Sequence, residues 1–147
     1  MDLAIEVANK SKGGPFGAVI IDSNNNIIAK SSNSVTVDND PTAHAEVNAI
    51  RAACKKKNNF KLDDCILFTT CEPCPMCLSA CYWANINTIY YANTRQDAAE
   101  INFDDSFIYD EIIKDISERS IEMTKMDNSD AIKTFNNWKN NTTKIEY

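Results

Sequence analysis

Residues 69–81, "TTCEPCPMCLSAC", contain four of the six cysteines of this 147-residue chain: Cys71, Cys74, Cys77 and Cys81. Their spacing of two, two and three residues is close to that of a run that holds an iron–sulfur cluster. The same stretch contains Pro-Cys-x-x-Cys, and Pro75 suits the first turn of a helix. A buried-type strand, "CILFTT" at 65–70, comes directly before it. The pattern therefore predicts a strand that leads through a cysteine cluster into a helix.

The apolar pattern divides the rest of the chain into alternating strands and helices. Strands are expected at residues 13–22, 27–35, 65–70 and 88–92, and the first two form a hairpin around a turn at 23–26. Helices are expected at residues 2–10, 40–57, 75–84, 104–116 and 130–140. In the second helix one apolar face is formed by Ala43, Val47, Ile50 and Cys54. The alternation predicts an α/β domain with helices layered on a mixed sheet.

The composition indicates one globular domain over residues 1–147. Hydrophobic residues make up 44% of the chain and charged residues 24%, which is ordinary for a globular protein. The N-terminus is too short and too charged for a signal peptide, and no apolar run approaches membrane-spanning length. We therefore expect a cytoplasmic protein, in which cysteines serve as thiols or metal ligands more often than as disulfides.

The charge is acidic and unevenly distributed. The net charge is −6, and residues 94–147 carry twelve acidic against seven basic residues. The one basic cluster, Lys55 to Lys57 with Lys61, fits the solvated end of a helix. A nucleic-acid partner usually requires a basic face, so the charge argues against tRNA or DNA as the substrate.

The only histidine, His44, lies in "PTAHAEV", with Glu46 two residues later and Cys74 thirty residues later. His-x-Glu followed by Pro-Cys-x-x-Cys is the signature of zinc nucleobase deaminases. One histidine and two cysteines suit a catalytic zinc, because the fourth position stays open for water. The sequence predicts a zinc site made of His44, Cys74 and Cys77.

Glu46 is expected to be the acid–base group rather than a ligand. His44 and Glu46 are about 200° apart around a helix, so they can share a site only at its first turn. The same holds for Cys74 and Cys77 around Pro75. Helix N-termini also favour thiolate over thiol. Two helix starts that face each other would thus form the pocket.

Two non-catalytic alternatives use the same cysteines. An iron–sulfur electron carrier would use Cys71, Cys74 and Cys77, but it leaves the His44 and Glu46 pattern unexplained. A structural zinc site would add Cys71 as a fourth ligand and make the chain a binding module. Cys81, one helical turn after Cys77, is most simply a buried apolar thiol.

Four stretches resemble the bacterial guanine deaminases, a family with the cytidine-deaminase-like fold: "NDPTAHAEVNAIRAAC", "CILFTTCEPCPMCLSACYWA", "DAAEINFDDSFIYDEI" and the terminal "KIEY". The resemblance covers nearly the whole chain. It implies a three-layer α/β/α domain around a five-stranded mixed sheet and one zinc ion per subunit. It also implies a homodimer that exchanges C-terminal segments, at about residues 127–147, so that one subunit's tail closes the other's pocket.

The resemblance also implies a set of substrate-binding residues: Phe16, Asn33, Trp83, Asp105 and Tyr147. Asn33 would hydrogen-bond the purine, Phe16 and Trp83 would be its apolar walls, and Tyr147 would reach it with its ring or carboxylate. Asp105 would be a second carboxylate that handles protons or recognises the amine. Simpler roles stay open: core packing for the aromatic residues, a turn for Asn33, and a helix cap for Asp105, with Asp104 next to it.

The expected activity is zinc-dependent hydrolysis of guanine to xanthine and ammonia. Other aminated rings, such as guanosine, isocytosine or a triazine, are alternatives on the same machinery. A tRNA adenosine deaminase is a further alternative, but it would need a basic rim for its RNA.

Overall fold

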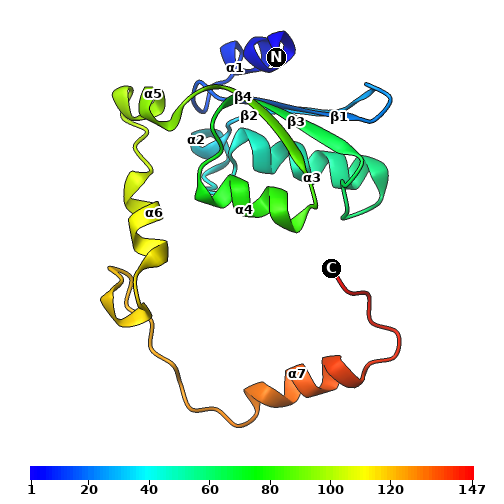
Figure 1. The fold of residues 1–147 in the computed structure, drawn as a ribbon, viewed down its shortest axis with the longest axis vertical. Coiled ribbons are helices and arrows are strands. Elements are labelled where there is room, and N and C mark those ends of the chain that lie inside the picture. Colours follow the sequence, from blue (N-terminus) through cyan, green and yellow to red (C-terminus); the bar gives the residue numbers. More distant parts are fainter. The chain divides into compact units, whose positions relative to one another are not determined.

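A four-stranded mixed sheet lies at the centre of the fold in the computed structural model, which describes all residues 1–147 (Figure 1). The strands are β1 (Gly17–Asp22), β2 (Ile27–Ser32), β3 (Cys65–Cys71) and β4 (Thr88–Asn93), in the order β2-β1-β3-β4. β1 is antiparallel to β2 and β3, and β3 is parallel to β4. The predicted hairpin and mixed sheet are confirmed.

The expectation of a fifth strand is wrong. It came from the family resemblance, whereas the residue pattern itself predicted four strands, and these four are the ones that form. After β4 the chain enters helices and irregular backbone, and no later segment pairs with the sheet. Residues 120–126, "SIEMTKM", partly alternate between apolar and polar side chains but have no strand beside them. β4 is therefore an edge strand.

Helices cover both faces of the sheet within residues 1–108. Figure 1 shows α1 on one side of the sheet and α3 and α4 on the other, which makes three layers. The helices of the chain are α1 (Asp2–Asn9), α2 (Val35–Asp38), α3 (Ala45–Lys57), α4 (Pro75–Trp83), α5 (Arg95–Glu100), α6 (Ser106–Ile113) and α7 (Ala131–Asn140), with a 3₁₀ turn η1 (Ile116–Glu118). None of them combines the length and apolar character needed to cross a membrane.

Helix α3 begins later than predicted. Residues 40–44 form a turn and an extended segment instead of a first helical turn, and the helix begins at Ala45. The reason is local, because Asp40 accepts hydrogen bonds from the backbone N–H and the hydroxyl of Thr42 and so stabilises a turn. The predicted apolar face is confirmed: Ala43, Val47 and Ile50 are buried, and Cys54 is partly buried against the core.

Helix α5 was not predicted, although its sequence carries a recognisable start signal. The hydroxyl of Thr94 accepts a hydrogen bond from the N–H of Asp97, and the Asp97 carboxylate accepts one from the N–H of Thr94. This reciprocal capping box stabilises a short helix that has little apolar periodicity of its own. The helix brings Arg95 and Ala98 to the functional site described below.

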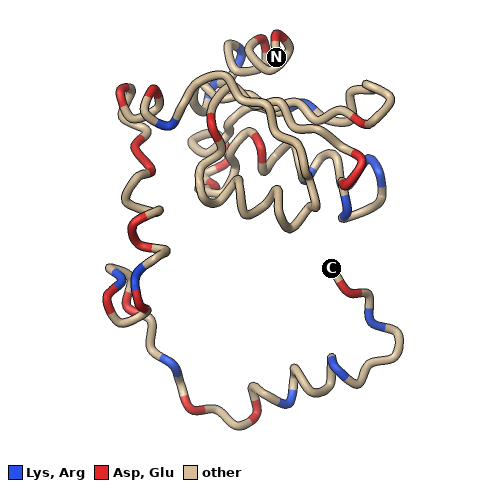
Figure 2. The backbone as a smooth tube through the Cα atoms, viewed as in Figure 1, with Lys and Arg blue, Asp and Glu red and all other residues tan.

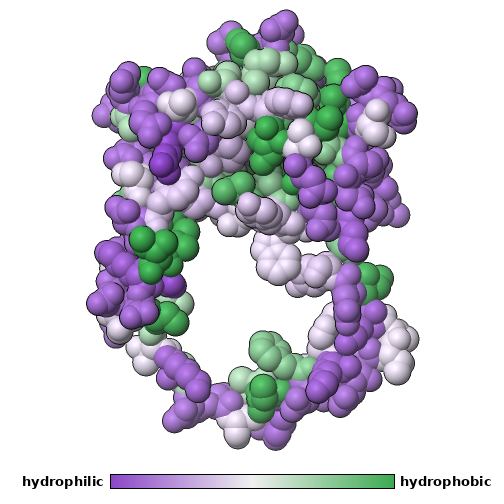
Figure 3. Space-filling view, in the orientation of Figure 1, coloured by the Kyte–Doolittle hydropathy of each residue, from purple (hydrophilic) through white to green (hydrophobic).

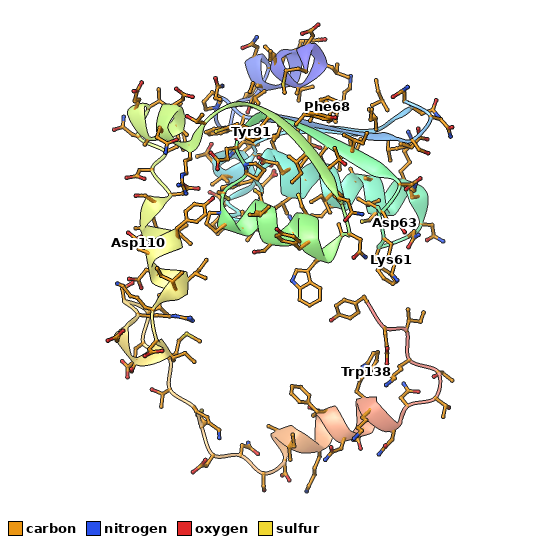
Figure 4. All side chains as sticks on the ribbon, in the orientation of Figure 1. Lys61, Asp63, Phe68, Tyr91, Asp110 and Trp138 are labelled. Carbon is orange, nitrogen blue, oxygen red and sulfur yellow. The ribbon has the colours of Figure 1, made fainter.

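The core lies between β1, β3 and α3. Its largest fully buried apolar side chains include Ile20, Leu62 and Leu67. Phe68 lies on the opposite side of β3, the side on which α1 lies (Figure 4). Its ring stacks on that of Tyr90, with centroids 5.1 Å apart. β3 is thus packed on both faces, as its predicted buried character requires.

Residues Tyr109–Tyr147 form a second compact unit, which we describe by itself. None of its residues is buried. On α7, Ile132, Phe135 and Trp138 follow one another at three-residue spacing, and all three are exposed (Figure 4). The space-filling view in Figure 3 shows apolar side chains on the surface of this segment. The unit therefore has no hydrophobic core of its own.

Gly17 is a point at which α1 approaches the sheet too closely for any side chain. A Cβ atom at this position would overlap the carbonyl oxygen of Ala4 and lie 2.7 Å from the backbone nitrogen of Ala8. We expect Gly17→Ala to lower the free energy of unfolding by about 1–3 kcal/mol through overpacking. The thermal midpoint should fall by several degrees, and calorimetry measures it. Lys30→Ala, on the exposed side of the paired strand, should change little; equal midpoints for the two variants would contradict the packing argument.

Candidate metal and substrate site

Two helix starts converge at the site, as the sequence predicted. His44 precedes α3 in an extended conformation, and Cys74 precedes α4 in nearly the same conformation. Glu46 is the second residue of α3, and Cys77 is the third residue of α4. Pro75 occupies the first turn of α4, where its missing N–H costs no hydrogen bond. The metal-type side chains therefore come from the residues at which each helix begins.

His44, Cys74 and Cys77 form a group whose ligand atoms lie within 4.8 Å of one another. The Nδ1 atom of His44 lies 3.5 Å from the sulfur of Cys74 and 3.5 Å from that of Cys77. A tetrahedral zinc ion has Zn–N near 2.0–2.1 Å and Zn–S near 2.3 Å, which places such atoms about 3.5 Å apart. The donor set and its spacing thus fit one zinc ion bound through Nδ1 and two sulfurs.

The electrostatics of the group favour a thiolate. The thiol of Cys77 donates to Cys74, and together with His44 it lowers the pKa of Cys74 to about 4. The same bond raises the pKa of Cys77, with burial adding to the effect. The hydrogen bond to Cys74 also raises the pKa of His44. The group therefore favours a thiolate at Cys74, which is the form in which cysteine binds a metal.

Glu46 is buried beside this group, with 5% of its surface exposed. Its Oε1 atom accepts a hydrogen bond from the hydroxyl of Thr69 at 2.9 Å, and its Oε2 atom lies 3.5 Å from the sulfur of Cys77. Burial raises the pKa of Glu46, while the bond from Thr69 opposes the rise. A carboxylate with a raised pKa is suited to exchange protons near neutral pH.

A cavity of about 420 Å³ opens onto His44, Glu46 and Cys74. This volume lies within the range of small-molecule sites. The other residues that line it come from the loop before β1, the segment after β2, the end of β3 and the region around α5: Gly13, Phe16, Asn33, Val35, Thr36, Cys71, Glu72, Arg95, Ala98, Asn102, Phe103, Asp104, Asp105, Phe107 and Ile108. The cavity therefore adjoins the metal-type group directly.

Asn33 lies in the cavity wall and is 5% exposed. Its Oδ1 atom accepts a hydrogen bond from the N–H of Val35 at 3.0 Å, and its carbonyl accepts one from the hydroxyl of Ser11. The turn role that the sequence left open is thus present. Because Oδ1 is engaged, the group that Asn33 can offer to a ligand is its Nδ2 donor.

The two adjacent aspartates have different surroundings. Asp104 accepts a hydrogen bond from the N–H of Ser106 and so caps the start of α6. Asp105 is partly buried, and burial followed by the nearby Cys74 thiolate raises its pKa. The hydrogen bond to the helix start is therefore made by Asp104; both aspartates line the cavity, and Asp105 lies near His44.

Two aromatic residues, Phe16 and Trp83, were expected to form apolar walls for the purine, and only one of them lines the cavity. Phe16 lines it and meets Phe103 edge to face, with ring centroids 5.0 Å apart. Trp83 does not line it and is 66% exposed at the end of α4. Tyr147 is the last residue of the second unit and is exposed. In a single chain the second aromatic ring of the cavity is therefore that of Phe103, which was not predicted from the sequence.

The remaining cysteines do not extend the group. Cys71 is buried at the end of β3, its thiol donates to the carbonyl of Thr94 at 3.5 Å, and burial raises its pKa to about 11. Cys81 is buried in the core, and burial raises its pKa to about 12. Neither belongs to the His44 group. The arrangement is that of an open three-ligand site, unlike the closed zinc and iron–sulfur alternatives.

Sequence reasoning also missed Thr69 and Arg95. Thr69 is one of several buried residues of β3, and nothing in the sequence distinguishes it from another strand threonine. Only the packing of α3 on the sheet brings Glu46 to its hydroxyl. Arg95 is the only lysine or arginine that lines the cavity. It lies in α5, the helix that the apolar pattern did not predict. Only the capping signal of that helix, the Thr94 and Asp97 pair, was readable in the sequence.

The family model for the cytidine and deoxycytidylate deaminase zinc-binding region matches residues 1–93, which include all three metal-type residues. The chain belongs to the cytidine and deoxycytidylate deaminase family. Membership accounts for the order His44, Glu46, Cys74 and Cys77, which is the signature of zinc deaminases. The zinc ion that the donor spacing fits is the cofactor of this deaminase family.

Relatives within this deaminase family differ in how much of the chain they match. The chain is 53% identical over 145 residues to guanine deaminase of Bacillus subtilis, covering 99% of this chain and 92% of that protein. It is 38% identical to tRNA-specific adenosine deaminase of Haemophilus influenzae, covering 62% of this chain and 54% of that protein. The match to the guanine deaminase therefore extends through the C-terminal segment, and the other does not.

Solved structures agree with these matches. The X-ray structure of guanine deaminase from Bacillus subtilis has a TM-score of 0.94 at 51% identity, covering 99% of this chain and 95% of that one. A related structure, a complex with 2,6-diaminopurine, has a TM-score of 0.68 at 29% identity, covering 71% and 60%. This deaminase family member thus shares its fold with a guanine deaminase and with a protein solved in complex with a purine.

Cys74→Ser should abolish zinc binding, whereas Cys71→Ser should retain it. Serine cannot supply the thiolate that the site requires, and Cys71 is not one of the three ligands. Zinc in the purified variants, measured by inductively coupled plasma mass spectrometry, should fall from about one ion per chain to near zero only for Cys74→Ser. Loss of zinc in Cys71→Ser would instead indicate a closed structural site, with Cys71 as a fourth ligand beside His44, Cys74 and Cys77.

Proposed function

We propose that this protein is a guanine deaminase, which hydrolyses guanine to xanthine and ammonia and uses one zinc ion per chain. The observation that carries the proposal is the group of His44, Cys74 and Cys77 beside the buried carboxylate of Glu46, open to a base-sized cavity. The substrate follows from the 53% identity to the Bacillus subtilis guanine deaminase over 99% of the chain.

His44, Cys74 and Cys77 hold the metal in this proposal, with the helix starts supplying partial positive charge that favours the thiolates. The zinc ion supplies Lewis acidity, which lowers the pKa of a water molecule toward neutrality. The remaining steps belong to the side chains of the protein.

Glu46 moves the protons. Its carboxylate takes a proton from the attacking water, whose oxygen forms a bond to C2 of guanine. It passes that proton to the adjacent ring nitrogen, N3, then takes the remaining proton from the new C2 hydroxyl and passes it to the 2-amino group. The C2–N bond then breaks and ammonia leaves, so that guanine and water yield xanthine and ammonia. The raised pKa of Glu46 suits a group that must both accept and donate protons.

Asp105 and Asn33 recognise the two edges of the base. Guanine presents N–H donors at N1 and the 2-amino group, and acceptors at O6 and N7. Asp105 accepts from the amine side, and Asn33 donates from Nδ2 to an acceptor, because its Oδ1 is already bonded to Val35. Phe16 and Phe103, which contact each other edge to face, together form an apolar wall for the ring.

The C-terminal unit closes the site by exchange between two chains. The apolar face of α7, formed by Ile132, Phe135 and Trp138, has no cover of its own and needs one. A second copy of the chain is the partner that the proposal assigns, with residues of about 127–147 exchanged. In that homodimer Tyr147 and Trp83 would reach the purine, as the sequence suggested.

A tRNA substrate fits the charge poorly. Acidic residues Glu72, Asp104 and Asp105 line the cavity against one arginine, Arg95. Figure 2 shows lysine and arginine interspersed with aspartate and glutamate along the chain from α6 to the C-terminus, with no continuous basic run. An RNA rim usually needs such a run. The free thiols of all six cysteines support a cytoplasmic location for the enzyme.

Glu46→Gln should lower kcat for guanine by at least about a hundredfold while the protein still binds zinc, because the amide cannot exchange protons. Ammonia release from guanine, guanosine, adenine, cytidine, isocytosine and a tRNA stem–loop, with the wild-type protein as reference, measures both substrate and mechanism. Release from another member of this panel but not from guanine would overturn the substrate assignment. Full activity of Glu46→Gln would overturn the acid–base role.

The paired substitution Phe135→Ser and Trp138→Ser should convert the dimer to a monomer, because it removes the apolar face of α7. Size-exclusion chromatography with light scattering, at micromolar protein, gives the mass directly. Thr134→Ser, on the same helix, should leave the dimer intact. A monomeric wild-type protein with full activity would rule out the exchanged dimer.

A further inference from the structure

Thr69 lies in the middle of the sheet and contacts the catalytic carboxylate. It is fully buried in β3, where its backbone pairs with Ala18 of β1 on one side and Tyr91 of β4 on the other. Its hydroxyl donates to Oε1 of Glu46 at 2.9 Å. Because strands flank it on both sides, the position of this hydroxyl is set by the sheet.

The two oxygens of Glu46 have different surroundings. Oε1 accepts the proton of the Thr69 hydroxyl, and Oε2 lies 3.5 Å from the sulfur of Cys77. Cysteine binds metals as a thiolate, so in the loaded site its sulfur has no proton to donate. Oε2 is then the oxygen of Glu46 to which no side chain of another residue donates.

We propose that Thr69 is a positioning residue for the deamination reaction, which anchors Oε1 of Glu46 so that Oε2 alone exchanges protons with water and substrate. This inference rests on the acid–base role of Glu46 in the proposed function. The terminal torsion of a glutamate side chain is soft, and burial alone does not fix its rotation. The hydrogen bond from Thr69 restrains it by holding one oxygen.

The assignment is consistent through the proton cycle. When Glu46 is a carboxylate, Oε1 accepts from Thr69. When Oε2 has taken a proton, Oε1 becomes the carbonyl-type oxygen and still accepts from the same hydroxyl. The Thr69 bond therefore persists while the proton passes from water to Oε2 and then to the base. No proton is transferred through Thr69 itself.

The next residue, Thr70, has a different role and provides a control. Its hydroxyl accepts a hydrogen bond from the N–H of Gly17 at 3.1 Å, and it contacts neither Glu46 nor the metal-type residues. Successive strand residues point to opposite faces, so one buried threonine faces α3 and the next faces away. Changing Thr70 should affect stability without affecting proton transfer.

The matched pair Thr69→Ala and Thr69→Ser isolates the hydroxyl, because both remove the methyl group and only serine keeps the donor. With zinc-loaded protein, Thr69→Ala should lower kcat about tenfold or more with KM within about twofold. Thr69→Ser should recover most of that loss. Zinc content should equal that of wild type in both. Thr70→Val should lower the thermal midpoint and leave kcat within about twofold of wild type.

Equal kcat values for Thr69→Ala and Thr69→Ser would overturn the inference, and so would a loss that appears in KM alone. Crystal structures of the two variants provide a measurement that needs no substrate. The carboxylate of Glu46 should rotate in Thr69→Ala and stay in place in Thr69→Ser, and an unmoved carboxylate in both would also contradict the proposal. Failure of the wild-type protein to release ammonia from guanine would count against the proposed function, whereas the structural comparison tests Thr69 independently.

Discussion

The convergence of His44 Nδ1 with the sulfurs of Cys74 and Cys77 within 4.8 Å is the constraint on which the rest of the structure depends. It requires α3 and α4 to begin at the same place, on the same face of the sheet. β3 meets this requirement because it ends at Cys71, only three residues before Cys74, while α3 packs along β2 and β1. Free backbone N–H groups at both helix starts favour the negative charge that the cysteines must carry. The metal site is thus a product of helix geometry as much as of residue type.

The acidic side chains of the site differ in their surroundings. Glu46 is buried and held by a hydroxyl, Asp105 is partly buried and open to the cavity, and Asp104 is committed to the start of α6. Similar carboxylates therefore differ in pKa and in availability because their neighbours differ. The amide of Asn33 is oriented in a similar manner: the backbone N–H of Val35 bonds to its Oδ1 atom and leaves the Nδ2 end for a ligand. Selective recognition of a base requires this kind of fixed donor and acceptor pattern.

In the C-terminal unit, local hydrogen bonds are formed but the apolar side chains are not packed. Its turn at residues 111–120 is held by hydrogen bonds, since the Glu111 carboxylate accepts from the N–H and hydroxyl of Ser120 and from the ammonium group of Lys114. Its apolar side chains, in contrast, stay exposed on α7 and beyond. Local hydrogen bonds can form a helix or turn, but they do not bury hydrophobic surface, and that surface gains stability only against another surface.

The sequence by itself predicted the four strands, the principal helices, the grouping of His44, Cys74 and Cys77, and Glu46 as their neighbour, because strand runs, helix starts and ligand spacing are local patterns. It also indicated that Cys81 is a packing residue. It did not determine the start of α3, which depends on the Asp40 turn. The division of roles between Asp104 and Asp105, and the places of Thr69 and Phe103 in the site, were decided only by the tertiary structure. The physical reason is that the places of Thr69 and Phe103 depend on contacts between segments far apart in the chain. Asp105 differs from Asp104 because the fold partly buries it near Cys74.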